Sequence, residues 1–475
     1  MSAAAPAIEP RPKSTTKTLI VLGGVVLAYS LVEAMLVPAL PLIQHGIGAS
    51  PSSITWVFTG LLLSGTVCTP LIGRLADIHE KKVVFLVVVT VVALGIFLAA
   101  IATSIVELAI GQILQGTGMG LFPLTLGFLR EILPAHKART GTGLIVGMSA
   151  LGSISGGLLA GPLLKVLPYN WLYWLPLGMI VILTVMGRRS LPSIPSGERG
   201  SVDWAGAVLL STGLFTMLIG LTQAPTWGWS SLKFLGLAAL SASLLTAFTV
   251  LELEIERPLV DLRSGGKTVG VICAIAFAVG WVTFTVYLSI PTIVASPSSA
   301  GYGLGGTPTL AGLVLLPMGL IGAVSALLAG PLERKVCAKP LMVLSSVPIM
   351  ASSAILLLAR HELIMLVFAA GLLGLGIGLG LTQAMNVVSS AVPAERVASA
   401  TGFVMVMRSV GSTLGAQVSG TVLASELIPG TPLPAWSSFT AIFVIATVVG
   451  LTSIAASFAL PRRISTPETR ISASA

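Results

Sequence analysis

Charged side chains are scarce in this sequence. Lys, Arg, Asp and Glu make up only 9% of its 475 residues, whereas a soluble domain carries about 25%. Because a soluble protein of this size must cover its outside with polar groups, the deficit argues against a soluble fold and indicates lipid as the solvent. The net charge of +9 is therefore no sign of nucleic-acid binding, and we expect the basic residues to mark one side of a membrane.

Residues that commonly perform chemistry are also few. The sequence holds three cysteines and four histidines, namely Cys68, Cys273, Cys337, His45, His79, His136 and His361. They are scattered and show no metal-ligand spacing. The glycine run Gly376 to Gly380 lacks the strand that a nucleotide-binding fingerprint requires. We expect no metal, no cofactor and no enzymatic activity, since a membrane enzyme or scaffold would need clustered His, Asp or Cys near one face.

Long apolar runs are what the sequence has in abundance. Each is about long enough to cross a hydrocarbon core of roughly 30 Å as a helix rising 1.5 Å per residue. Such spans must be helical, because lipid offers no hydrogen-bond partners to the backbone. The sequence predicts an all-α polytopic membrane protein with spans at 18–41, 54–72, 83–103, 106–129, 141–164, 171–187, 204–222, 234–251, 269–294, 310–331, 341–359, 363–388, 397–424 and 437–460.

The distribution of basic residues predicts the orientation. Fourteen spans place both termini on one side of the membrane. With that side taken as cytoplasmic, only Lys165, Lys233 and Arg360 fall outside and Arg408 falls within a span, which leaves 22 of the 26 basic residues inside. This bias is the positive-inside pattern. We expect a multi-pass protein of the cell (inner or plasma) membrane with both termini cytoplasmic.

The chain contains an internal repeat. The segment that begins at Pro134 and includes Gly143, Met148 and Gly152 recurs, shifted by 259 residues, from Pro393. Gly73-Arg-Leu at the end of the second span has a weaker echo in Gly330-Pro-Leu at the end of the tenth. Both matches fit two six-helix halves related by an axis along the membrane normal, with two helices inserted between them. The predicted boundaries are a disordered cytoplasmic tail 1–17, halves at 18–190 and 269–460, an inserted segment 191–268 and a cytoplasmic tail 461–475.

Several motifs resemble the major facilitator superfamily, and specifically its fourteen-helix drug:proton antiporter branch. They are Gly73-x-x-x-Asp77-x-x-x-Lys81-Lys82, Gln115-Gly116-Thr-Gly118, the glycines Gly147, Gly152, Gly156, Gly157 and Gly161, and the flanks of the inserted pair at Val202-Asp-Trp, Trp227-Gly-Trp229 and Arg257-Pro-Leu. The resemblance covers nearly the whole chain and implies a transporter that works by alternating access. In the family, the loop after the second helix latches neighbouring cytoplasmic helix ends in one conformation.

The departures from the family pattern bear on the mechanism. Gln112 stands where the family usually has an arginine, and Gly157 stands where it usually has a proline. The resemblance therefore implies transport more firmly than proton antiport. In the loop, Ile78 replaces a basic residue and Glu80 replaces a glycine. We expect a latch weaker than the family's, formed by Gly73, Arg74, Asp77, Lys81 and Lys82.

Two ionisable residues within spans are candidates for proton coupling. Glu33 lies about 22 Å into the first span at 1.5 Å per residue, a depth at which an ionised carboxylate is costly and usually serves a function. It is either a proton carrier or a hydrogen-bonded structural residue. Arg408 lies about 17 Å into the thirteenth span and is either a fixed charge facing a cavity or part of a pair that locks one conformation.

Further residues are candidates for a substrate cavity, and each also has a structural interpretation. The polar candidates either contact substrate or bond between helices, and the aromatic ones either form a ligand wall or anchor the protein at the interface. These candidates are Trp56, Gln112, Gln115, Trp281, Tyr287, Gln383, Asn386 and Gln417. The five glycines of the fifth span are expected to let helices approach closely.

The favoured prediction is a secondary transporter that exports small, mostly apolar compounds, such as drugs or natural products, in exchange for protons. Its expected partners are a small-molecule substrate, protons and the lipid bilayer, with no nucleic acid, and we expect a monomer. The alternative is a facilitator or importer of a small metabolite, including an anionic one attracted to Arg408, without proton coupling. A membrane enzyme or scaffold is the third alternative.

Overall fold

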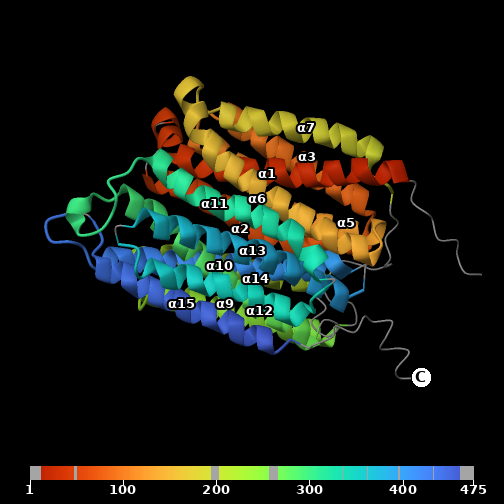
Figure 1. Cartoon of the computed structure of the whole chain (residues 1–475). Helices are drawn as coiled ribbons and strands as arrows, with labels where there is room; N and C mark the ends of the chain where they lie inside the picture. The colour runs from red at the N-terminus through yellow and green to blue at the C-terminus, as the bar shows by residue number, and fades with distance from the viewer. Residues whose placement is uncertain are drawn as a thin grey trace, which may run out of the picture.

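The computed structural model describes residues 12–47, 51–193, 203–255, 266–333, 335–360, 362–393, 396–431 and 433–460. These residues fold into helices joined by short connections (Figure 1). The first half of the chain supplies α1 (Pro12–Ile47), α2 (Pro51–Ile78), α3 (Lys81–Ile101), α4 (Ile105–Gly116), the short 3₁₀ helix η1 (Thr117–Gly120), α5 (Leu121–Ile132), α6 (Ala135–Val166) and α7 (Trp171–Ser190). The remainder supplies α8 (Trp204–Trp227), α9 (Leu232–Glu254), α10 (Gly266–Ala295), η2 (Ser298–Ala300), α11 (Pro308–Glu333), α12 (Ala338–Leu356), α13 (Leu363–Ala391), α14 (Val397–Ser425) and α15 (Trp436–Phe458).

The predicted all-helical membrane fold is confirmed. Within the described residues, thirteen helical segments are long and apolar enough to cross a membrane. The remaining predicted span, 54–72, lies within the 28-residue helix α2. The predicted span 106–129 is a single crossing built from α4, η1 and α5, with the 3₁₀ break at Thr117–Gly120. A 3₁₀ stretch inside a helix often marks a hinge.

The helices form two layers. Figure 1 shows α1, α3, α6 and α7 in the upper layer and α10, α12, α13 and α15 in the lower one. The layers meet where α6 lies beside α11, and this contact is built by small residues. A Cβ atom placed on Gly143 would lie 2.2 Å from the carbonyl oxygen of Ala326, so only glycine permits the backbones to come this close.

Three glycines of the fifth predicted span, Gly147, Gly152 and Gly156, lie close to neighbouring helices. Gly152 and Gly156 lie against the backbone of α1, where an added Cβ would come within 2.4 Å of a carbonyl oxygen. Gly147 instead faces α11, where an added Cβ would lie 3.3 Å from the carbonyl oxygen of Ala323. Gly157 has nothing within 4 Å of an added Cβ, and the surroundings of Gly161 lie outside the described side chains.

The two helices α8 and α9 pack against each other and against both layers. Ala207, Leu210 and Leu214 of α8 form a buried cluster with Val406 and Val410 of α14. Leu71 of α2 lies against the same cluster. At the far end of α8, the indole Nε1 of Trp229 donates to the hydroxyl of Thr421 on α14, at 3.4 Å.

The ends of the chain differ from the predicted tails in one respect. Helix α1 begins at Pro12, so the predicted tail 1–17 overlaps six helical residues. Proline is favoured in the first turn of a helix, and the polar residues that follow carry the helix beyond its apolar run. The predicted tail 461–475, the remainder of the tail before Pro12, and the linkers 194–202 and 256–265 lie outside the described residues.

Candidate functional site

The predicted latch residues lie at one end of the bundle, which we call the basic end: the end where α2 ends at Ile78 and α3 begins at Lys81. Gly73 of α2 lies against the beginning of α14, where an added Cβ would be 3.0 Å from the Cα of Ser399. The hydroxyl of Ser399 donates a hydrogen bond to the carboxylate of Asp77. Since α2 comes from the first half of the chain and α14 from the second, this contact joins the two halves at the basic end.

The other charged residues of the predicted latch have separate surroundings. Lys81 is buried and pairs with Glu131 of α5, with Nζ and Oε1 2.5 Å apart. This pair lies within one layer, so it fixes the beginning of α3 to the end of α5. Arg74 is also buried, whereas Lys82 is half-buried. Of the residues predicted to form the latch, Gly73 and Asp77 make the described contacts to α14.

A second contact between the layers lies at the basic end, where α11 meets α6. Gly330 of α11 lies against the backbone of Arg139 and Thr140, and an added Cβ would be 2.9 Å from the Thr140 Cα. The carboxylate of Glu333 pairs with the guanidinium of Arg139 across 3.6 Å. The side-chain amide of Asn386, on α13, donates to the same carboxylate at 2.9 Å. Asn386 thus positions Glu333 within its own layer.

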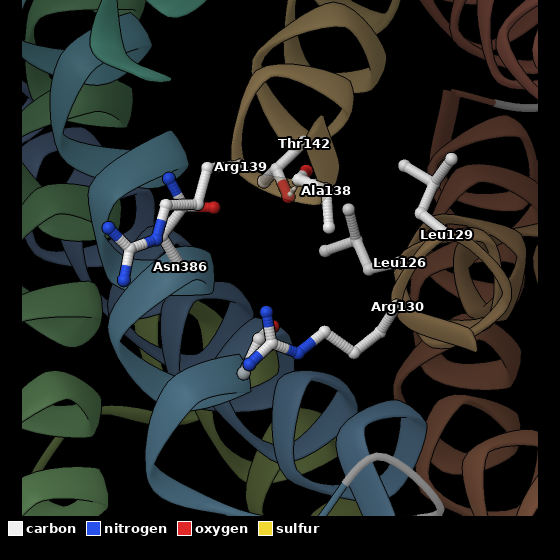
Figure 2. Close-up of a pocket in the computed structure, with 8 residues that line it drawn as sticks. Leu126, Leu129, Arg130, Ala138, Arg139, Thr142 and Asn386 are labelled. Carbon is white, nitrogen blue, oxygen red and sulfur yellow. Dashed lines mark hydrogen bonds between the residues drawn. The ribbon is translucent and has the colours of Figure 1, made fainter. Parts of the chain in front are cut away.

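A small polar pocket adjoins this second contact. Figure 2 shows Arg130, Arg139 and Asn386 around it, contributed by α5, α6 and α13. Its volume of about 10 Å³ is close to the space that one water molecule needs. Arg130 interacts electrostatically with both Arg139 and Glu333. One carboxylate of α11 therefore interacts with two guanidinium groups, contributed by α5 and α6.

The two contacts are related by the internal repeat. Under the 259-residue shift, Arg139 and Thr140 become Ala398 and Ser399, and Gly143 becomes Gly402. Gly330 therefore meets the beginning of α6 as Gly73 meets the beginning of α14. One turn further in, a Cβ added to Gly402 would lie 3.6 Å from the Thr69 carbonyl oxygen, at the position where Gly143 packs against Ala326 in the other contact. The echo at Gly330, weak in sequence, makes the same kind of backbone contact.

A third group of residues lies deep in the bundle, where the two halves face each other. Glu33 of α1 interacts electrostatically with Arg408 of α14. It also interacts with Tyr29, one turn earlier on α1, and with Tyr287 of α10. The Tyr29 hydroxyl and the Arg408 Nε are buried and have no hydrogen-bond partner among the described residues. The structure thus brings together the two residues predicted for proton coupling, from opposite halves.

The ring of Tyr29 is held by the 3₁₀ break in the fourth crossing. An added Cβ on Gly118 would lie 2.2 Å from the Tyr29 Cε2 atom, so glycine leaves the room that the ring occupies. Tyr29 is only 6% exposed. The break at Thr117–Gly120 therefore sets the position of the helix turn that carries Glu33.

The structure separates the predicted cavity residues into several environments. Gln112 is buried and donates to the Tyr173 hydroxyl of α7 at 3.2 Å, and Asn386 bonds to Glu333 as described above. Gln115 and Gln383 are buried, and their side-chain amides have no hydrogen-bond partner among the described residues. Trp281 is half-buried beside Phe277, with ring centroids 6.1 Å apart. Gln417 is half-buried on α14, and the side chain of Trp56 lies outside the described ones.

The sequence reasoning missed three residues that the structure places at these sites. Arg139 and Glu333 were interpreted only as a basic residue and as part of a weak echo. Tyr29 carried no signal beyond its position four residues before Glu33, which places it on the same helix face. The 259-residue shift relates Arg139 to Ala398, which contacts Gly73, but that contact is visible only in the structure.

The helical bundle, its two layers and its membrane-length helices are the architecture of a multi-pass membrane protein. The model of the Major Facilitator Superfamily matches residues 22–416 and 271–475. The chain therefore belongs to the major facilitator superfamily.

Curated relatives at about a quarter identity carry transporter names. The chain is 25% identical over 432 residues to the uncharacterized MFS-type transporter Rv1877 of Mycobacterium tuberculosis, covering 90% of this chain but only 61% of that protein. It is 27% identical to the tetracenomycin C resistance and export protein of Streptomyces glaucescens (86% of this chain, 76% of that protein). It is 26% identical to the multidrug resistance protein Stp of Mycobacterium tuberculosis (82% and 72%). Two of these three relatives are named for resistance or export.

Solved structures share the fold. The human organic anion transporter MFSD10 matches with a TM-score of 0.65 at 15% identity, covering 94% of this chain and all of that one. A peptide transporter in an auto-inhibited state matches with a TM-score of 0.61, also at 15% identity. At this identity the likeness shows the fold alone.

Proposed function

We propose that this transporter exports small, mostly apolar compounds in exchange for protons, with Glu33 as the proton carrier and Arg408 as the fixed charge that faces it. The observation that carries the proposal is the electrostatic interaction between Glu33 and Arg408 across the two halves. The names of the relatives support an efflux role, because one is an export protein and another a multidrug resistance protein.

Protonation of Glu33 controls how strongly the halves attract each other. While the carboxylate is ionised, its attraction to the Arg408 guanidinium favours the arrangement seen in the structure. A proton on Glu33 removes the charge and therefore the attraction, so the halves separate at this point more easily. Since the attraction acts in an interior of low effective dielectric, it is stronger than the same pair would be in water.

The basic end is assigned to the cytoplasm in this proposal. The assignment is supported by the 22 basic residues that fall on that side in the fourteen-span topology. Because the contacts of Gly73 and Gly330 hold the two halves together at this end, we assign the structure to a state closed toward the cytoplasm. In that state, Glu33 receives its proton from the outside. The proton-loaded form then turns toward the cytoplasm.

This order of events gives exchange of substrate against protons. Once the basic end opens, Glu33 releases its proton to the cytoplasm and a substrate enters the space between the halves. Loss of the proton restores the attraction to Arg408, which returns the protein to the state closed at the basic end. Binding energy for an apolar substrate comes from burying its surface, and this requires few specific polar contacts.

The test is transport in proteoliposomes under an imposed pH gradient. The probes are tetracenomycin C, the compound named for one relative, and ethidium, a fluorescent lipophilic cation. We expect substrate movement coupled to proton movement in the wild type and loss of the coupling in Glu33→Gln. The matched control is Glu362→Gln, an exposed carboxylate between α12 and α13.

The outcomes separate the parts of the proposal. Proton movement that persists unchanged in Glu33→Gln would remove Glu33 as the carrier. Transport of both probes without any proton movement would refute antiport and favour a facilitator. For Arg408, we expect Arg408→Ala to lose coupling and Arg408→Lys to keep part of it, because lysine retains the charge. Normal coupling in Arg408→Ala with normal folding would leave this residue no role in the mechanism.

A further inference from the structure

The internal repeat predicts two equivalent seams between the halves, and the structure shows that they differ. One seam is α6 against α11, and the other is α2 against α14. Near the basic end the two seams match, because the contact of Gly143 with Ala326 corresponds, by the repeat, to the contact of Gly402 with Thr69. The difference lies deeper in the membrane.

Beyond this first contact, the α6–α11 seam continues as direct packing of one helix on the other. Gly147 lies 3.3 Å from the Ala323 carbonyl oxygen, measured from an added Cβ. Further along, Gly319 of α11 packs against the side chain of Ile154. Small residues thus bring α6 and α11 into direct contact along this seam.

At the equivalent depth, the α2–α14 seam is filled by α8. The repeat equivalent of Gly147 is Val406, and that of Leu151 is Val410. Both valines are buried in the cluster with Leu210 and Leu214 of α8, and Leu71 of α2 lies at its edge. Valines here would hold α2 and α14 apart, whereas glycine and alanine let α6 and α11 meet. The inserted pair occupies the space that these larger side chains create.

The polar link of the inserted pair goes to α14 as well. Trp229, in the turn between α8 and α9, donates to the Thr421 hydroxyl near the far end of α14. Among the described side chains, the buried members of the cluster come from α8, α9 and α14, and α2, which also packs against α8, contributes the partly buried Leu71. Along the length of α14, then, α8 is held by apolar packing at Val406 and Val410, and the turn after α8 is held near the far end of α14 by a hydrogen bond.

We propose that α8 and α9 form a side wall that is carried by α14 and slides along α2, keeping lipid out of the α2–α14 seam as the halves move. The inference rests on the rocking motion of the proposed function but not on proton coupling. The inserted pair then has a mechanical role, because one seam opens and closes by glycine contact while the other stays covered by a wall attached to the C-terminal half.

The test measures distances between spin labels at the basic end by double electron–electron resonance. The cysteines Cys68, Cys273 and Cys337 are first replaced by serine. Labels are placed on exposed positions as Ala205→Cys on α8, His79→Cys after α2, Lys137→Cys on α6 and Lys335→Cys after α11. Each pair is measured with the wild-type latches and again with Asp77→Asn and Glu333→Gln, which weaken both contacts that close this end.

The pair Lys137–Lys335 reports the motion of the halves and serves as the reference. We expect this distance to lengthen in the weakened variant. The wall predicts that the Ala205–Lys335 distance stays constant, because both labels move with the C-terminal half, while the Ala205–His79 distance changes. If Ala205–His79 stays constant and Ala205–Lys335 changes, the wall belongs to α2 and the inference is wrong.

If the Lys137–Lys335 distance does not change, the rocking motion is refuted, and the sliding with it. The result in which α8 moves with α2 refutes only the sliding and leaves the rocking motion intact. Lipid exclusion is measured separately with a bimane fluorophore on Leu71→Cys in bilayers of lipids brominated on their acyl chains. We expect no quenching with either set of latches. Quenching observed only in the weakened variant would show lipid entering the seam and would overturn the wall.

Discussion

The contact between Arg139 and Glu333 allows a quantitative prediction about the gate at the basic end. The perturbation is Glu333→Gln, which removes one charge and keeps the size of the side chain. In the wild type, Glu333 faces Arg139 at 3.6 Å and interacts with Arg130. In the variant, two guanidinium groups of one half face a neutral amide, so the closed state loses attraction while the open state is hardly affected.

The magnitude follows from the exposure of the pair. Arg139 is 35% exposed and Glu333 is 6% exposed, so solvent screens the interaction in part. Exposed ion pairs contribute about 0.2–1 kcal/mol, and we place this one near the upper limit because the carboxylate is buried. The bond from Asn386 lies within one half and does not affect opening. A loss of about 1 kcal/mol shifts the ratio of open to closed states about fivefold, since 1.4 kcal/mol is a factor of ten.

The assay is the alkylation rate of a cysteine that the closed gate protects. Ser389 lines the small pocket and is 6% exposed, so Ser389→Cys in a background without the three native cysteines is the reporter. A membrane-impermeant maleimide is applied from the basic side. We expect the rate to rise about fivefold in Glu333→Gln and not in the control Glu362→Gln.

A double-mutant cycle identifies the pair as the cause. We expect Glu333→Gln and Arg139→Gln together to accelerate alkylation by less than the product of the two single effects, because each single variant already breaks the same interaction. An unchanged rate in Glu333→Gln, or single effects that simply multiply, would refute the idea that this ion pair holds the gate closed.

Three further predictions concern packing. Gly73→Ala and Gly330→Ala bring a Cβ to about 3 Å from backbone atoms of α14 and α6, so both should accelerate alkylation of Ser389→Cys, whereas Gly157→Ala, with nothing within 4 Å, should not. Lys81→Met removes the lysine paired with the Glu131 carboxylate at 2.5 Å and should lower stability by about 3 kcal/mol, measured as a fall in Tm far larger than that of Lys82→Met. Gly118→Ala pushes a methyl group into the Tyr29 ring and should cost about 1–3 kcal/mol, which Tyr29→Ala should relieve in the double variant; an unshifted Tm in Gly118→Ala would contradict the packing.

Much of the fold was predictable because lipid permits so few solutions. An apolar run long enough to span must be a helix, and a repeat with one register then arranges the helices in two halves. Helix ends were less predictable. Polar residues extend a helix past the membrane core, as at Pro12, and the apolar run contains no sign of where that extension stops. The break at Thr117–Gly120 was also missed, because the run 106–129 has the pattern of one continuous span.

The candidate site was predictable in its members but not in its partners. Glu33 and Arg408 stand out because a charge within a span is costly, and the sequence locates each to its depth. Their interaction depends on how α1 and α14 face each other, which no local pattern contains. The partner of Gln112 was equally unpredictable. Its position on α4 is compatible both with the predicted place in a cavity and with the observed bond to Tyr173.

The echo at Gly330 shows why the gate was underestimated. Comparison of side chains makes it look degraded, since Asp77 has no exact counterpart and Ser399 is replaced by Thr140. At the α2–α14 contact, the Ser399 hydroxyl donates to the Asp77 carboxylate. At the α11–α6 contact, the Thr140 hydroxyl has no hydrogen-bond partner among the described residues, and the Arg139–Glu333 ion pair joins the two helices instead. What the two contacts share is a glycine on the end of one helix against the backbone at the beginning of another. Because that contact needs only a missing Cβ, we expect it to tolerate substitution of the charged neighbours. We therefore expect the departures at Ile78 and Glu80 to weaken one latch without removing the gate, which the second contact helps to hold.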